Sequence, residues 1–139
     1  MAVPAGELSV GDSRELVLVD DLTRTRIVQY AGASGDYNPL HTDEVFATKV
    51  AGFPSVFAHG MLTMGMTGRV LTDWFGAERL KSYGVRFVGQ VWPGDTLTAT
   101  AVVTALRAED GEHLADLSVA TRNQRGEEVL TGTATARLV

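Results

Sequence analysis

In the second half of the chain, apolar and polar residues alternate, which is the pattern of strands that bury one face. The alternation runs through residues 85–91, 97–104, 115–119 and 130–138. Three short segments rich in turn-forming residues separate these runs, at residues 93–95, 109–111 and 123–126. Four consecutive strands joined by short turns predict an antiparallel meander.

In the first half of the chain, apolar residues are spaced differently. A strand is predicted over residues 14–19, and its Leu-Val-Leu-Val run is apolar at every position, so we expect both of its faces to be covered. A helix should follow, because three side chains recur at helical spacing, namely Ile27, Tyr30 and Ala31. Asp21 or Thr23 can cap its start, and Gly32 and Gly35 should end it.

The longest predicted helix covers residues 60–74, where apolar side chains are frequent. Gly65 and Gly68 each cost roughly 1 kcal/mol in a helix interior. We therefore expect the backbone of this helix to pack closely, against a sheet. A shorter helix is expected over residues 42–48, with Thr42 or Asp43 as its N-cap. Residues 51–55 should end it.

This order of elements predicts the fold. Helices in the first part followed by strands in the second define the α+β class. One long apolar helix over one face of a curved antiparallel sheet is the outline of a hot-dog fold. No linker, repeat or low-complexity segment divides residues 1–139, whose length suits a single domain.

Composition and charge narrow the possible functions. A net charge of −5, a pI of about 5.1 and the lack of a basic cluster argue against a nucleic-acid partner. The absence of cysteine excludes disulfides, thiolate metal sites and a cysteine nucleophile, and it fits a cytoplasmic protein. Residues 1–12 do not resemble a signal peptide. No apolar run approaches the ~20 residues that a membrane helix needs, so no membrane association is expected.

Asp36, Asn38 and His41 form a compact polar group just after the first predicted helix. A carboxylate and an imidazole that converge on one water can take up and return a proton near neutral pH. Pro39 should keep the segment out of a helix, and Asn38 could support the pair. The alternative is structural: Asp36 caps a turn that Asn38 and Pro39 form, and His41 caps the next helix.

Residues 57–66 suggest a second part of a site. A helix that starts at Gly60 presents unpaired backbone N–H groups, and a glycine lets a substrate carbonyl approach them closely. Negative charge that develops on that carbonyl would be stabilised there. The alternative is that His59 caps the helix and that a stripe of apolar residues belongs to the core, namely Met61, Leu62, Met64 and Met66.

Other chemistries find little support. Ser34 or Ser55 could serve a Ser–His–Asp hydrolase, but no G-x-S-x-G elbow is present. Asp36, His41 and His59 lack a compact metal-ligand spacing along the chain, so no metal site is expected. His113 lies beside a predicted turn, where we expect a solvated side chain.

Three segments together resemble a known family. They are Y-A-G-A-S-G-D-Y-N-P-L-H at 30–41, H-G-M-L at 59–62 and R-F-V-G-Q-V-W-P-G-D-T-L at 86–97. In this order they are similar to motifs of the MaoC-like, (R)-specific enoyl-CoA hydratases. A-H-G-M-L-T-M-G at 58–65 further resembles the catalytic subunits of (3R)-hydroxyacyl-ACP dehydratases of long-chain, mycolic-acid-type fatty acid synthesis.

The resemblance implies a hot-dog fold, a dimer, and a thioester substrate in a tunnel at the dimer interface. It implies that Asp36 and His41 are the catalytic pair, that Asn38 supports them, and that the Gly60 N–H faces the thioester carbonyl. It also suggests residues that line the tunnel, namely Tyr30, Pro39, His59, Met61, Leu62 and Met64.

The implied reaction is the reversible hydration of trans-2-enoyl-CoA or enoyl-ACP to the (3R)-3-hydroxyacyl thioester, without a metal or other cofactor. A homodimer is expected, and a heterodimer with a related hot-dog subunit is the alternative. Two further functions stay open. A hot-dog thioesterase would require a carboxylate on the long helix, and residues 60–72 contain none. A subunit that only binds the acyl chain should have lost Asp36 or His41, and this chain retains both.

Overall fold

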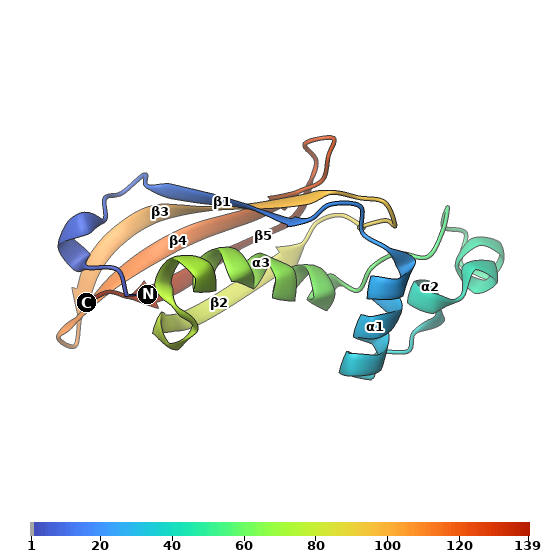
Figure 1. The fold of residues 1–139 in the computed structure, drawn as a ribbon, viewed down its shortest axis with the longest axis horizontal. Helices are drawn as coiled ribbons and strands as arrows, with labels where there is room; N and C mark the ends of the chain where they lie inside the picture. Colours follow the sequence, from blue (N-terminus) through green and yellow to red (C-terminus); the bar gives the residue numbers. More distant parts are fainter. Residues whose placement is uncertain (1) are drawn as a thin grey trace.

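A five-stranded antiparallel sheet curves around one long helix in the computed structural model, which describes residues 2–139 (Figure 1). The α+β class and the hot-dog outline are thereby confirmed. The helices are α1 (Arg24–Ser34), α2 (Pro39–Thr42), the π-helical turn η2 (Phe46–Val50) and α3 (Gly60–Phe75), with 3-10 turns η1 (Ala5–Glu7) and η3 (Ala77–Arg79). The strands are β1 (Ser13–Val19), β2 (Leu80–Phe87), β3 (Leu97–Glu109), β4 (Glu112–Arg122) and β5 (Glu128–Arg137).

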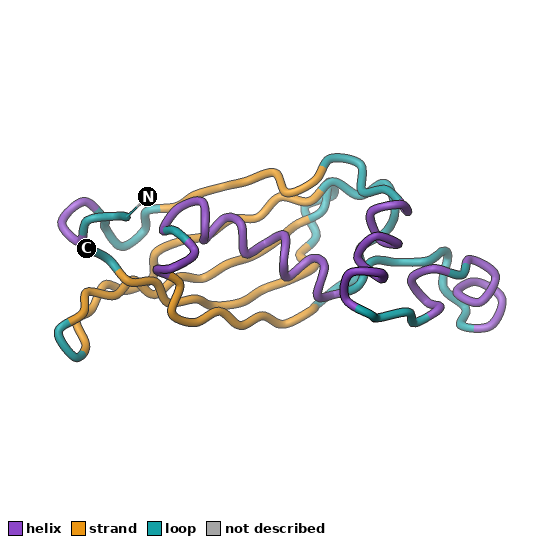
Figure 2. Tube along the Cα trace, turned by 60° about the horizontal axis from the view of Figure 1, so that its bottom comes forward, coloured by secondary structure: helices purple, strands orange, loops and turns teal. Residues whose placement is uncertain are grey.

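The core lies between α3 and the concave face of the sheet, where the helix crosses the strands diagonally (Figure 2). On α3, Val70, Leu71 and Phe75 are buried. Many of the inward-facing strand residues are small, which leaves room for the helix: Ala99, Ala101, Ala115, Ala134 and Ala136. A hydrogen bond of 2.6 Å between the Thr67 and Thr121 hydroxyls links α3 to β4 inside this core.

The strand order is β1-β3-β4-β5-β2, which corrects part of the predicted meander. Strands β3, β4 and β5 are joined by tight turns, as predicted. Strand β2, however, pairs with β5, because both edges of β3 are occupied by β1 and β4. Residues 88–96 therefore cross from the edge strand β2 to β3, which lies next to the opposite edge strand β1, instead of forming a hairpin.

The predicted helix ends are largely correct. Thr23 caps α1 by accepting a hydrogen bond of 3.1 Å from the Arg26 N–H, and Gly35 ends this helix in a left-handed conformation. Gly32 lies inside α1 rather than at its end, so that prediction was wrong. Asp43 accepts from the Phe46 N–H, in agreement with a cap before the short helical segment.

Two packing predictions need correction. Val17 is 56% exposed, because β1 is an edge strand whose outer face is uncovered in this chain. The close packing predicted at Gly68 is confirmed, because a Cβ at this position would lie only 3.5 Å from the Tyr83 ring. Gly65 instead faces open space, so its lack of a side chain has no packing reason here.

Among residues 2–139, no helix is long and apolar enough to cross a membrane.

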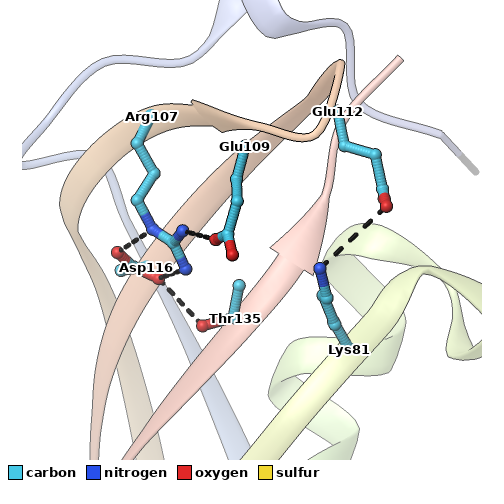
Figure 3. Close-up of polar contacts among 6 residues, drawn as sticks. All are labelled: Lys81, Arg107, Glu109, Glu112, Asp116 and Thr135. Carbon is cyan, nitrogen blue, oxygen red and sulfur yellow. Dashed lines mark hydrogen bonds and ion pairs between the residues drawn. The ribbon is translucent and has the colours of Figure 1, made fainter.

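A polar cluster ties the strands together near the β3–β4 turn (Figure 3). The Asp116 carboxylate accepts from Arg107 Nε at 2.8 Å and from the Thr135 hydroxyl at 2.8 Å. Arg107 also pairs with Glu109. The hydrogen bond from Arg107 holds the pKa of Asp116 below its usual range. These contacts join β3, β4 and β5 on the side of the sheet away from α3.

The pH dependence of this cluster can be tested. Because the pKa of Asp116 is lower in the folded state, its contribution to stability is present above the unfolded pKa of about 3.9 and is lost as the pH falls further. We expect Asp116→Asn to lower the urea midpoint at pH 7, and the difference from wild type to shrink below pH ~4. The control is Asp110→Asn in the β3–β4 turn, which removes the same charge. An equal loss in both variants would contradict the assignment.

Candidate active site

Asp36, His41 and His59 meet at the start of α3, at the end of the sheet opposite the two chain termini (Figure 1). Asp36 lies in the loop after α1, His41 lies on α2, and His59 immediately precedes α3. One carboxylate oxygen and one nitrogen of each imidazole all lie within 4.8 Å of one another. Residues that are up to 23 positions apart in the chain thus form one cluster.

The loop that carries Asp36 is shaped by its own polar side chains. The Asn38 N–H donates to Asp36 Oδ1 at 3.2 Å, and the Leu40 N–H donates to Asn38 Oδ1 at 3.0 Å. Asn38 is therefore the N-cap of α2, and Pro39 takes the first helical position, where its missing N–H costs nothing. The prediction that Pro39 keeps this segment out of a helix was wrong from Pro39 onward, because the proline starts a helical turn instead of preventing one.

His41 is oriented by a main-chain carbonyl. Its Nδ1 lies 2.6 Å from the Phe57 oxygen. A carbonyl oxygen only accepts, so Nδ1 carries the hydrogen and the neutral ring keeps its lone pair on Nε2. The Phe57 ring also packs edge-on against His41, with 5.3 Å between the ring centroids. These contacts leave His41 one basic nitrogen and a fixed ring plane, which suits proton transfer.

His59 is the buried member of the cluster, with 2% of its surface exposed. Its Nε2 donates to the main-chain oxygen of Asp36 at 3.0 Å, and its ring stacks on His41 at 3.8 Å with an angle of 26° between the planes. It occupies the N-cap position of α3, but its side chain caps no N–H among the described residues. The interpretation of His59 as a side-chain helix cap was therefore wrong.

Gly60 begins α3, and no acceptor for its N–H is found within residues 2–139. A Cβ at this position would lie 3.0 Å from the Phe87 ring, so the absence of a side chain allows that close contact. Next to Gly60 lies a cavity of about 370 Å³, lined by Phe57, Ala58, Gly60, Phe87, Val88, Gly89 and Gln90. A free N–H beside a cavity at a helix start can bind a partly negative oxygen.

Four residues of the cavity wall were not predicted as site residues, namely Phe87, Val88, Gly89 and Gln90. The available signal was the third of the similar motifs, which contains all four. Phe87 and Val88 are also apolar yet 48% and 50% exposed, which only the folded structure reveals.

The residues expected to line a tunnel are spread around the cluster. Tyr30 packs edge-on against the His59 ring at 4.9 Å, and Pro39 is exposed at the start of α2. Leu62 and Met64 are partly buried against the core, whereas Met61 is 55% exposed. Their role in binding an acyl chain stays a prediction.

The cluster has the side-chain types of a metal site, which its spacing along the chain had not suggested. Its geometry is unsuited to one. Zinc binds imidazole nitrogens in the ring plane at about 2.1 Å. Stacked rings 3.8 Å apart and 26° from parallel do not direct their lone pairs to a common point. His41 Nδ1 and His59 Nε2 already donate to carbonyl oxygens. The arrangement favours proton chemistry over metal binding.

The fold and the site together define a class: a hot-dog domain with a carboxylate and an imidazole beside the start of its long helix. The profile of the family described as "MaoC like domain" matches residues 7–124. The chain belongs to this MaoC-like family, as the sequence motifs suggested.

Individual relatives agree with this assignment. The mitochondrial 3-hydroxyacyl-[acyl-carrier-protein] dehydratase of Arabidopsis thaliana is 33% identical over 134 residues, which cover 91% of this chain and 80% of the relative. The unliganded R-hydratase PhaJ1 from Pseudomonas aeruginosa matches with a TM-score of 0.84 at 25% identity, covering 99% of this chain and 88% of that one. A chain of the ChsH1–ChsH2 complex from Mycobacterium tuberculosis matches with a TM-score of 0.77 at 29% identity, covering 94% and 98%. This chain spans only 23% of the length of two other mycobacterial relatives.

The role of Asn38 as a cap can be tested. Asn38→Ala removes the acceptor for the Leu40 N–H, and we expect the free energy of unfolding to fall by about 1 kcal/mol, the usual cost of losing an N-cap. Urea denaturation measures this difference. Asn38→Asp keeps an oxygen at the same position and should remain close to wild type. If both variants lose the same stability, the cap is not the reason.

Proposed function

We propose that this domain catalyses the reversible hydration of trans-2-enoyl thioesters, on CoA or acyl carrier protein, to (3R)-3-hydroxyacyl thioesters. The observation that carries the proposal is the convergence of the Asp36 carboxylate and the His41 imidazole within 4.8 Å, next to the free N–H of Gly60. The names of the relatives as hydratases and dehydratases support the same reaction class. We place the reaction in the cytoplasm, with which a cysteine-free chain is compatible.

The geometry supports a simple division of roles. The thioester carbonyl accepts from the Gly60 N–H, which draws electron density from C3 of the enoyl group. Asp36 and His41 hold one water between them. As the water oxygen bonds to C3, the pair takes up one proton from the water, and the pair then delivers this proton to C2. The enolate-like charge that forms on the carbonyl oxygen is stabilised at the start of α3. Dehydration is the same path reversed.

His41 Nε2 is the nitrogen able to receive a proton, because Nδ1 donates to the Phe57 carbonyl. Asp36 uses Oδ1 to accept from the Asn38 N–H, which leaves its second oxygen for the water.

Hydrolysis of the thioester is the alternative from another reaction class. Such a mechanism would require a carboxylate on α3 that points at the thioester carbonyl. Asp73 is the one acidic residue of this helix, and it lies in the last turn. At 1.5 Å per residue it is roughly 20 Å from Gly60, at the other end of the sheet. This distance favours hydration over hydrolysis.

We also propose that the domain acts as a homodimer, with a heterodimer as the alternative that the ChsH1–ChsH2 complex exemplifies for its own chains. Strand β2 has an unpaired outer edge, and the exposed side chains of its last residue, Phe87, and of the following Val88 lie at its end. An unpaired edge beside exposed apolar residues commonly marks an interface. The same residues line the cavity next to Gly60, so a partner here would narrow the entrance to the site.

The decisive test follows the enoyl-thioester absorbance with trans-2-enoyl-CoA of short and long chains. We expect Asp36→Asn and His41→Asn each to lower kcat by ~10³-fold, because a general acid–base group usually contributes about this factor to the rate. Both changes preserve local structure. Asparagine at 36 keeps the oxygen that accepts from Asn38, and asparagine at 41 keeps an N–H near the position of Nδ1. His41→Ala, which lacks that N–H, provides a comparison.

Controls separate the alternatives. His113→Asn, at an exposed position on β4, should keep wild-type activity. Release of free CoA in place of loss of the enoyl band would indicate a thioesterase. Wild-type activity in both Asn variants would contradict the proposal. Sedimentation of the same preparation determines whether one or two chains form the active species.

The role of the Gly60 N–H has its own test. Gly60→Pro removes this N–H at the first helical position, where proline is tolerated, and the extended backbone of His59 suits a following proline. Gly60→Ala keeps the N–H and adds the same Cβ against Phe87. We expect the proline variant to have a kcat ~10²-fold below that of the alanine variant. Equal activities would mean that the N–H does not bind the carbonyl.

A further inference from the structure

We propose that His59 is a positioning residue that joins Asp36 and His41 into one unit and does so as a neutral imidazole. The inference rests on the proposed function, and the sequence had suggested only a cap or a tunnel wall for His59. Asp36 lies in an exposed loop and His41 on a helix of four residues, so neither is well fixed by its own element. His59 is buried and adjoins the sixteen-residue helix α3.

Two contacts connect His59 to the proposed catalytic pair. The hydrogen bond of 3.0 Å from Nε2 fixes the main chain of Asp36 and so the origin of its carboxylate. The stacked ring, 3.8 Å away, supports one face of the His41 imidazole, while the Phe57 carbonyl holds its edge. Loss of His59 would free both residues together, although it need not touch the substrate.

Simple packing does not explain a histidine at this place. A buried polar atom without a partner costs free energy, and His59 Nδ1 has no partner among residues 2–139. The Thr63 hydroxyl, one helical turn further along α3, is also buried without a partner. An apolar side chain would avoid the first of these costs. What such a side chain could not supply is the N–H that the Asp36 carbonyl accepts.

The charges around His59 favour its neutral state. The groups that face it are the His41 ring, the Tyr30 ring and, within 4.8 Å, the Asp36 carboxylate. One carboxylate can balance one imidazolium but not two stacked ones. His41 has to take up a proton during turnover, and its ring is the more accessible of the two. His59 therefore holds the pair without competing for that proton.

Nitrogen-15 NMR of the imidazoles tests this state without any assay of activity. The chain has three histidines, and the exposed His113 serves as reference, assigned through His113→Asn. We expect neutral His41 to carry its hydrogen on Nδ1 and His59 on Nε2. A hydrogen on Nδ1 of His59, in a neutral or in a doubly protonated ring, would overturn the proposal.

Kinetics of two variants test the positioning role. His59→Phe keeps a ring that can stack but has no N–H, whereas His59→Gln offers an amide N–H near the position of Nε2. We expect His59→Phe to lower kcat by ~10²-fold with little change in KM, as a misplaced catalytic group does. His59→Gln should recover part of this loss. The pH profile of kcat/KM should also change in His59→Phe, because the neighbour of His41 is altered.

The outcomes separate this inference from the proposed function. If His59→Phe folds, as its circular dichroism and urea midpoint show, and keeps wild-type kcat and pH profile, the positioning role is wrong. If His59→Phe does not fold, the comparison of His59→Gln with wild type and the NMR tautomers still decide. If the wild-type protein hydrates no enoyl thioester, the proposed function fails, while the NMR result continues to report on the arrangement of the two rings.

Discussion

The packing of α3 against the sheet is the constraint that positions every proposed catalytic group. Small residues on the concave face let the helix lie close, and the Thr67–Thr121 hydrogen bond fixes it further. The start of α3 is thereby held at one end of the sheet. Two groups next to that start, the His59 side chain and the Phe57 carbonyl, then hold the loop and the short helix that bear the proposed acid–base pair. Precision at the site comes from the core and not from the loop.

In the Asp36–His41 segment, the structural interpretation and the proposed catalytic one do not exclude each other. Asp36 and Asn38 do shape the chain through hydrogen bonds to main-chain N–H groups, as their residue types alone would suggest. Only one carboxylate oxygen of Asp36 is used in this way. A single sequence of turn-forming residues thus aims a carboxylate and an imidazole at one point while leaving a free oxygen and a free nitrogen between them.

Local patterns predicted what depends on local interactions. The period of α3, the alternation of β3 to β5 and the Thr23 cap are properties of a few adjacent residues, so they could be found in the sequence. The position of β2 beside β5 could not, because it depends on which edges of the sheet are already paired. The stacking of His59 on His41 joins residues 18 positions apart, because α2 lies beside the segment that precedes α3, and no periodicity encodes this contact. The motif resemblance could point to Asp36 and His41 as site residues because a family motif relates residues that are distant in the chain.

Both ends of the described chain lie at the end of the sheet opposite the site (Figure 1). They are also joined to each other, since the Ala5 N–H donates to the Val139 carbonyl at 2.8 Å and the Val139 N–H to Val3 at 3.0 Å. A segment added at either end would therefore lie at the far end of the sheet from the proposed acid–base pair. The architecture suits a module that can be spliced into longer polypeptides in many contexts, which agrees with its match to a limited stretch of much larger relatives.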